Sequence, residues 1–233
     1  MLLKYDLHIH TGLSPCAHKD MTPNNIVRMA HLNQLDTIAI TDHNSTKNIE
    51  VVMDVAKDYG IKVIPGIEIE SKEEIHSLVY FSTLNDVYNM QRIIDNNMKS
   101  IKNNAKLFGQ QNIYNNKDEV IGIEKKLLLS SINLTINQIY QYTIKLKGAM
   151  VFAHIDRPSN SIISNLGMMP HNIKTKTIEV SRYATMDQYK KMYSDYHIIQ
   201  SSDAHELGYI GICEKFIQID DNTTAKLVDK LRG

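Results

Sequence analysis

The chain has no tryptophan, only four phenylalanines and only two cysteines among its 233 residues. Cys16 and Cys213 are too few for a disulfide framework, which fits a reducing compartment. Lysine plus arginine and aspartate plus glutamate number 26 each, so the formal net charge is zero. No overall field therefore attracts nucleic acid or an anionic membrane, and local groups must hold any anionic substrate.

Long apolar runs are also missing. The charged residues Lys4 and Asp6 appear before an apolar stretch of signal-peptide length can develop, and no later stretch approaches the roughly 18 apolar residues of a membrane span. The sequence therefore predicts a cytoplasmic protein that does not bind membranes. There is no glycine-rich phosphate loop, which disfavours nucleoside-triphosphate chemistry of that type. The scarcity of aromatic residues argues against a long nucleic-acid track.

What the sequence does have is histidine at the ends of predicted strands. Alternate positions on a strand point to the same face, so His8 and His10 can reach one ion together, as can Asp203 and His205. Imidazole and carboxylate are the ligands expected for zinc, manganese or iron. The histidines at or near such strand ends are His8, His10, His18, His43, His76, His154 and His205.

Short apolar runs alternate with amphipathic helical windows, a pattern typical of a mostly parallel sheet or barrel. Thr22-Pro23 should start a helix that runs through Leu32, and a helix that opens at Ser45 or Thr46 should end at Gly60. Two more helices are expected over 185–195 and 223–231. Strands are predicted at 4–10, 37–41, 62–69, 77–81, 149–154, 177–181, 198–202 and 215–219.

Residues 84–147 interrupt this alternation. We interpret them as a helical and hairpin insertion between two barrel strands, within a single domain of residues 1–233. Shielding of the core and substrate selection are both open as roles for the insertion. Its expected elements are one long polar helix over 84–107, an Asn- and Gln-rich turn around 112–116, a strand at 119–123 and a helix over 135–147.

The chain resembles the polymerase and histidinol phosphatase (PHP) domain family over nearly its whole length apart from the insertion. The resemblance implies an α/β fold, a distorted (β/α)7 barrel of the PHP type with a metal cleft at the carboxyl ends of its strands. It also implies a metal-dependent phosphoesterase. The motifs that carry it stand in sequence order: Asp6-Leu7-His8-Ile9-His10-Thr11, Ile40-Thr41-Asp42-His43, Gly66-Ile67-Glu68, His76, Ala153-His154 and Ser202-Asp203-Ala204-His205.

The resemblance implies a trinuclear site with up to three divalent transition metal ions, drawn from zinc, manganese and iron. It makes Glu68 a bridge between two of the ions. Asp42, beside His43, either orients a ligand or simply ends its strand. The implied ligands are His8, His10, Glu68 and Asp203 for the first ion, Glu68, His76 and His154 for the second, and His43 and His205 with one ligand from the first loop for the third.

That first loop is where the sequence departs from the usual family pattern. The family commonly has Ser-Asp-Gly after the two histidines, whereas this chain has Ser14-Pro15-Cys16. Counting back from Thr22-Pro23 aligns His18 with the usual aspartate, and Asp20 is the alternative ligand. Cys16 is a weaker candidate, because a thiolate suits zinc but cysteine is more often a small buried residue.

The implied chemistry is hydrolysis of a phosphate ester by a hydroxide that bridges two metals. Arg157, three residues after His154, is placed to grip two phosphate oxygens with its guanidinium. Arg182 is a second candidate, for which surface solubility is the plain alternative. The expected substrate is a small phosphomonoester or the end of a short oligonucleotide. The alternative function is a non-catalytic metal-binding PHP module with a structural or partner-binding role, but the full ligand set favours the hydrolase.

Overall fold

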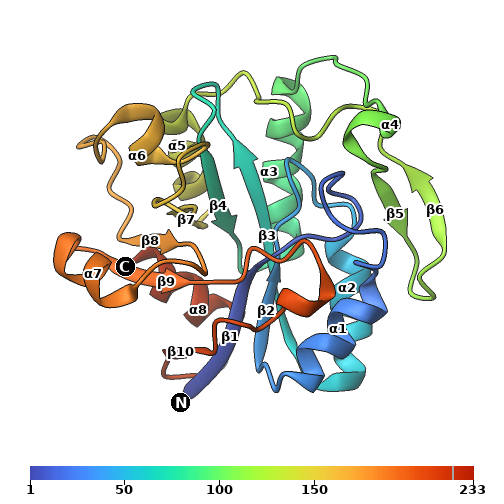
Figure 1. The fold of residues 1–233 in the computed structure, drawn as a ribbon, viewed down its shortest axis with the longest axis horizontal. Coiled ribbons are helices and arrows are strands. Elements are labelled where there is room, and N and C mark those ends of the chain that lie inside the picture. Colours follow the sequence, from blue (N-terminus) through green and yellow to red (C-terminus); the bar gives the residue numbers. More distant parts are fainter. Residues whose placement is uncertain (222) are drawn as a thin grey trace.

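A computed structural model describes residues 1–221 and 223–233. Its centre is an eight-stranded sheet with the strand order β10-β1-β2-β3-β4-β7-β8-β9 (Figure 1). The predicted strands are all present, with ends that differ by a few residues. They are β1 (Leu2–Ile9), β2 (Thr37–Ile40), β3 (Lys62–Glu70), β4 (His76–Tyr80), β7 (Ala149–Phe152), β8 (Thr177–Val180), β9 (His197–Gln200) and β10 (Lys215–Gln218).

The sheet curls into a distorted barrel. Strands β1, β2 and β3 run parallel, β4 runs antiparallel between β3 and β7, and β8 and β9 continue parallel to β7. Beyond β9, the amide of His10 donates to the carbonyl of Ala204 at 3.0 Å, and the amide of Ala204 donates to the carbonyl of His8 at 3.1 Å. These bonds join the two ends of the seven-stranded barrel, while β10 pairs antiparallel with the first half of β1. The predicted PHP-type barrel is confirmed.

Helices cover the outside of the barrel and one of its ends. Helix α1 (Pro23–Leu32) packs beside α2 (Ile49–Ala56) after the first two strands (Figure 1). Helix α8 (Thr224–Arg232) packs where strands begin, and the hydroxyl of Thr177 at the start of β8 donates to the carbonyl of Leu231 at 2.6 Å. Apolar side chains of α8 and of the strands form one buried cluster here, which includes Leu3, Ala149 and Leu227. The polar residues of the cluster described below lie at the carboxyl ends of the parallel strands. The remaining short helices are α6 (Ile162–Leu166), α7 (Met186–Met192) and the 3-10 turns η1 (Lys57–Tyr59) and η2 (Leu207–Tyr209).

The segment 84–147 differs from its prediction in two respects. The turn expected around 112–116 is wrong in its first half, because Asn112–Tyr114 form a strand that pairs with Val120–Ile123. The expected long helix is split into α3 (Leu84–Asn97) and the short α4 (Ala105–Phe108). The chain leaves the helix because residues beyond it pair with a distant segment, as the amide of Leu127 donates to the carbonyl of Ile101 at 2.8 Å. A two-stranded hairpin of β5 (Asn112–Tyr114) and β6 (Val120–Ile123) follows, and then α5 (Ile136–Lys145), which starts with a capping box at Thr135.

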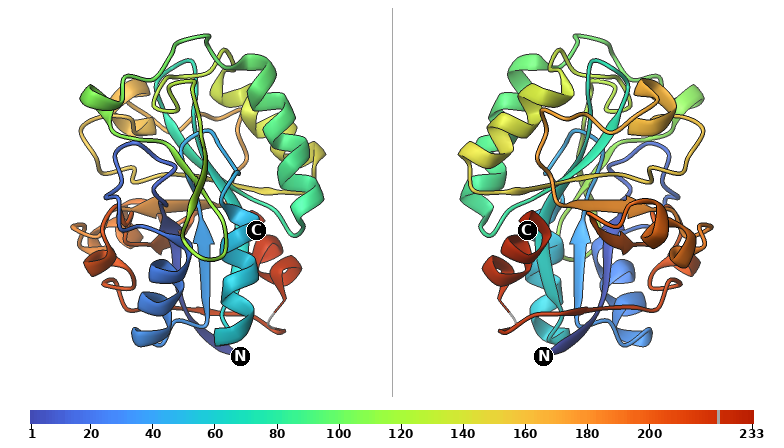
Figure 2. Two further views of the ribbon diagram at one scale, coloured as in Figure 1. Left: turned by 90° about the vertical axis from the view of Figure 1, so that its right-hand side faces the viewer. Right: turned by 90° about the vertical axis from the view of Figure 1, so that its left-hand side faces the viewer.

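The β5–β6 hairpin lies against the loop that follows β1. In the left view of Figure 2 it faces the viewer, close to the blue segment. The carboxylate of Asp118 at its tip accepts hydrogen bonds from the amide of Asn24 at 3.0 Å and the hydroxyl of Thr22 at 2.7 Å. Thr22 makes no side-chain cap of its own, so the hairpin supplies the negative charge at the start of α1.

No helix among the described residues is long and apolar enough to cross a membrane.

Candidate metal centre

The barrel gathers eight of the nine predicted metal ligands around one point. Most of them end or follow parallel strands, and His76 starts the antiparallel β4, so all reach the same end of the barrel. Six of these eight side chains are buried, and His76 and His205 are intermediate in exposure. Buried imidazoles and carboxylates need partners, because unpaired polar groups are costly in the interior. The gathered residues are His8, His10, His43, Glu68, His76, His154, Asp203 and His205.

The carboxylate of Glu68 is the hub of this cluster. Its Oε1 lies 3.0 Å from Nδ1 of His76 and 3.2 Å from Nε2 of His154. Its Oε2 lies 3.1 Å from Nδ1 of His43 and 3.4 Å from Nε2 of His10. The histidines hold the pKa of Glu68 well below its usual range, even though burial acts to raise it. A carboxylate that stays ionised with both oxygens facing imidazoles is placed to bridge two ions.

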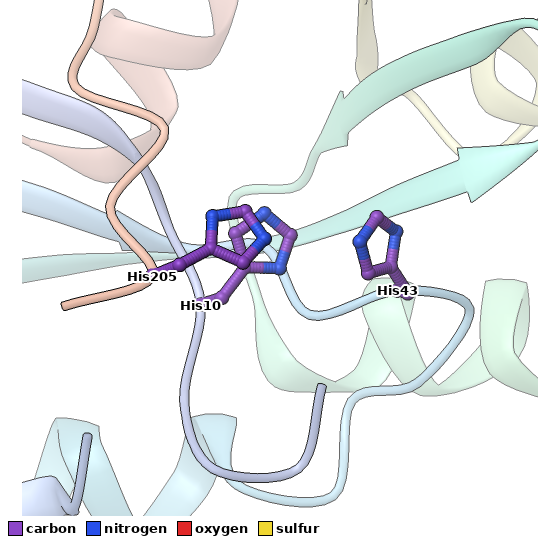
Figure 3. A group of neighbouring side chains, drawn as sticks. All are labelled: His10, His43 and His205. Carbon is purple, nitrogen blue, oxygen red and sulfur yellow. The ribbon is translucent and has the colours of Figure 1, made fainter. Parts of the chain in front are cut away.

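Asp203 is the second carboxylate of the cluster. Its Oδ1 lies 3.3 Å from Nε2 of both His8 and His10. His8, His10 and Asp203 offer ligand atoms that all lie within 4.8 Å of one another, and His43, Glu68 and His76 form a second such group. The third group is His10, His43 and His205 (Figure 3), in which the ring centroids of His10 and His205 are 4.2 Å apart.

Several buried ring nitrogens of the cluster lack a hydrogen-bond partner in the part of the protein that the structure describes, so they are available to bind cations. Among the described residues, the buried nitrogens Nε2 of His8, Nε2 of His10, Nδ1 of His43 and Nδ1 of His76 have no hydrogen-bond partner, although each faces Glu68 or Asp203. Burial lowers the pKa of His10 to about 4, so this ligand is neutral near pH 7. Imidazole nitrogens that face ionised carboxylates are the donor set of a transition-metal site once an ion has displaced any proton they carry.

The sequence analysis missed one residue that orients two of these histidines. The carboxylate Oε1 of Glu179, buried in β8, accepts from Nδ1 of His8 at 2.9 Å and from the amide of His154 at 3.2 Å. The first bond fixes the His8 ring so that Nε2 is left for an ion. A signal was present in the sequence, because a carboxylate inside the apolar strand Thr177–Val180 needs a buried partner.

Asp42 takes the orienting role that the sequence left open. Its carboxylate Oδ1 accepts from the hydroxyl of Ser14 at 2.7 Å, and that hydroxyl in turn lies 3.0 Å from Nδ1 of His10. Asp42 also accepts from the amide of Thr11 at 2.8 Å. Burial raises the pKa of Asp42 to about 6, although these donors favour its ionised form. The chain Asp42–Ser14–His10 therefore leaves Nε2 of His10 for an ion, as Glu179 does for His8.

The two candidate ligands of the first loop, His18 and Asp20, lie outside the three ligand groups. His18 is exposed, and its Nδ1 lies 3.4 Å from the Asp20 carboxylate rather than in any of the three ligand groups. The loop is nevertheless held beside the site, since the amide of His18 donates to the carbonyl of His205 at 2.8 Å. Cys16 is exposed and lines the pocket over the centre, but it belongs to none of the three ligand groups.

The two predicted phosphate contacts lie in different places. Arg157 lines the pocket, and its Nη2 forms an ion pair with Oδ2 of Asp203 at 2.7 Å. Arg182 turns to the protein instead, where its Nη1 donates to the carbonyl of Ser202 at 2.7 Å. Arg157 therefore has the better position for a ligand of the metal centre.

Left-handed backbone conformations cluster at this site. His154 has a φ of 29°, Asp203 a φ of 49°, and Asn44, just after His43, a φ of 49°. Such conformations are strained for residues with a side chain and persist where surrounding contacts impose them. The geometry of the cluster is thus built into the loops at the strand ends.

Comparison with known proteins agrees with this architecture. A curated 5′-3′ exoribonuclease from Haemophilus influenzae is 32% identical over 74 residues, which is 32% of this chain and 26% of that protein. The lesion-specific endonuclease PfuEndoQ from Pyrococcus furiosus shares the fold, with a TM-score of 0.72 at 21% identity. That likeness covers 100% of this chain and 56% of the endonuclease, so the chain spans little more than half of it.

A second solved structure, of Endonuclease Q in complex with a 27-mer duplex substrate with an abasic lesion at the active site, gives a TM-score of 0.74 at 19% identity, over 100% of this chain and 57% of that one. The PHP domain family matches residues 6–205. This range includes every residue of the histidine and carboxylate cluster. The chain belongs to the PHP domain family.

Proposed function

We propose that this protein is a metal-dependent hydrolase of phosphate esters, which acts on a small phosphomonoester or on the end of a short oligonucleotide. The observation that carries the proposal is the set of buried, unpartnered histidine nitrogens around Glu68 and Asp203. Five residues of the cluster line a pocket of about 340 Å³ together with Arg157, namely His43, Glu68, His76, Asp203 and His205. A metal donor set beside a partly exposed guanidinium suits an anionic substrate.

The cluster would hold the ions implied by the family. His8, His10, Glu68 and Asp203 would bind the first, Glu68, His76 and His154 the second, and His43 and His205 with a ligand from the first loop the third. Divalent ions in these positions would lower the pKa of a bound water and take up charge on the phosphoryl oxygens. Glu179 and Asp42 would keep the rings of His8 and His10 in place for this.

Arg157 would bind the substrate phosphate. Its ion pair with Asp203 fixes the guanidinium at the wall of the pocket, and its side chain is 38% exposed, so further N–H groups face solvent. Those groups can donate to two phosphate oxygens at once. The two contacts would strengthen as negative charge gathers on the non-bridging oxygens.

The second candidate is a metal-binding PHP module without catalysis. Two features favour the hydrolase over it. Eight of the nine predicted ligands lie together around Glu68 and Asp203, and several of them line a pocket. The relatives reported above are named as an exoribonuclease and an endonuclease, which points to phosphodiesters among the substrates.

A substrate panel separates the two candidates. The protein is stripped with a chelator, reconstituted separately with zinc, manganese and iron, and assayed against phosphomonoesters and 5′- and 3′-phosphorylated oligonucleotides. We expect turnover of at least one ester that disappears on chelation and returns with metal. Asp187 is an exposed carboxylate away from the cluster, so Asp187→Asn is the control and should keep wild-type metal binding and turnover. Tight metal binding without turnover of any ester would favour the non-catalytic module.

A further inference from the structure

Three side chains beside the metal centre form a layered stack. The guanidinium of Arg182 lies 4.0 Å from the ring centroid of Tyr209 and 4.8 Å from that of Tyr183. Its Nη2 also donates to the hydroxyl of Tyr183 at 2.9 Å, and its Nη1 is bound to the carbonyl of Ser202. The guanidinium is therefore fixed from several sides, and it holds the Tyr183 ring in turn.

The outer layer of the stack is open. Tyr183 is 75% exposed, whereas Arg182 and Tyr209 are intermediate. Burial of apolar surface therefore does not explain the position of the Tyr183 ring. An exposed aromatic ring held by a cation and a hydrogen bond loses little further freedom when a flat ligand lies on it.

The stack adjoins the phosphate side of the pocket. Arg182 Nη1 reaches the carbonyl of Asp203 at 3.4 Å, while the carboxylate of Asp203 pairs with Arg157. The loops that carry Arg157 and Tyr183 are also tied together, because the amide of Ser181 donates to the carboxylate of Asp156 at 2.6 Å. A ligand whose phosphate meets Arg157 thus has Tyr183 on the neighbouring loop.

We infer that Tyr183 is the stacking surface for a nucleobase of the substrate, so that the substrate class is a nucleotide or a nucleic-acid end rather than a sugar phosphate. This inference rests on the proposed phosphoesterase function. Every base presents a π face, and stacking on a tyrosine tolerates any sequence. The guanidinium of Arg182 next to the Tyr183 ring adds a cation to this stacking surface. Because the net charge of the chain is zero, binding of an anionic substrate depends on such local contacts.

Binding of three ligands to the metal-reconstituted protein tests the inference. Isothermal titration should show that 5′-AMP or 3′-AMP binds about tenfold more tightly than ribose 5-phosphate, which lacks a base. Tyr183→Ala should remove this difference, whereas Tyr183→Phe, which keeps the ring, should retain most of it. Phe216→Ala, at an aromatic ring that is 55% exposed on β10, is the matched control and should keep the wild-type preference.

The outcomes distinguish this inference from the proposed function. Equal affinity of the wild-type protein for all three ligands, or an unchanged base preference in Tyr183→Ala, would overturn the stacking role even if phosphate esters are hydrolysed. Absence of turnover on every ester would instead overturn the phosphoesterase, and base-dependent binding would still report on Tyr183. Circular dichroism of Tyr183→Ala confirms that the variant is folded.

Discussion

The carboxylate of Glu179 lies 2.9 Å from Nδ1 of His8, inside the barrel and away from solvent. Burial acts to lower the pKa of His8, but Glu179, Asp203 and Glu68 outweigh it and raise the pKa well above its ordinary value. The same Glu179 oxygen accepts the amide of His154. One residue outside the three ligand groups therefore orients two of the predicted ligands.

Removal of Glu179 should weaken the metal site without removing a ligand. Loss of such an orienting partner commonly lowers metal affinity by about 10- to 100-fold, and we expect Glu179→Ala to fall in this range. Glu179→Gln keeps an acceptor for the ring and should lose less. Competition with a chelator measures both constants, with Glu119→Ala, an exposed glutamate of the insertion, as the control. Wild-type affinity in Glu179→Ala would show that the His8 ring needs no such partner.

Metal binding should release protons from the ligands that are protonated in the metal-free protein, which include His8 and His76. Burial lowers the pKa of His76, but Glu68 and Glu70 outweigh it and raise the pKa to about 9. At pH 7 the metal-free His76 carries a proton that an ion must displace, so affinity for that ion should rise about tenfold per pH unit from about pH 7 towards 9. His10, with a pKa of about 4, adds no dependence in this range.

Calorimetry of metal binding in buffers with different ionisation enthalpies counts these protons. His76→Gln should remove the proton release assigned to His76. Metal binding at pH 7 with no proton uptake by the buffer, in the wild-type protein, would contradict the assignment.

Local signals were sufficient to predict the order of strands and helices and two pairs of ligands, whereas the (β/α)7 barrel and the other ligands were predicted from the resemblance to the PHP family. The spacing of His8 and His10 on one strand and of Asp203 and His205 after another places each pair toward one point, whatever the rest of the chain does. The apolar runs with helical windows between them set the order of strands and helices in the same way. These features need no knowledge of distant contacts.

The parts that were missed depend on contacts far apart in the sequence. Glu179 meets His8 across 171 residues, so its place in an apolar strand indicates a buried partner but not which residue that partner is. The expected helix over 84–107 breaks after Asn97 because the next residues pair with the chain near Leu127. The ligand of the first loop stays a prediction, since His18 and Asp20 face each other in solvent.

Two single substitutions decide between these loop residues. If His18 completes the third ligand group with His43 and His205, His18→Ala should lose about one metal per chain while Asp20→Ala keeps full occupancy. Elemental analysis of the reconstituted variants gives the counts. The reverse pattern would assign the ligand to Asp20, and full occupancy in both would exclude the pair.

Arg157 should act on the substrate and not on the metals. Arg157→Lys keeps the charge but loses the planar pair of donors, so we expect catalytic efficiency on a phosphate ester to fall about tenfold or more with metal content unchanged. Arg92→Lys, at an exposed arginine of α3, is the matched control and should keep wild-type efficiency. Wild-type efficiency in both Arg157→Lys and Arg157→Ala would make this arginine structural.

The most direct test of a metal-dependent hydrolase built around Glu68 is the turnover of a phosphate ester by Glu68→Gln, measured together with its metal content. Glu68 touches His43, His76 and His154 at 3.0–3.2 Å, so the substitution should cost more metal and more activity than His76→Gln, which removes a single ligand. We predict loss of nearly all turnover and of more than one ion per chain in Glu68→Gln. Wild-type turnover and metal content in that variant would contradict the account.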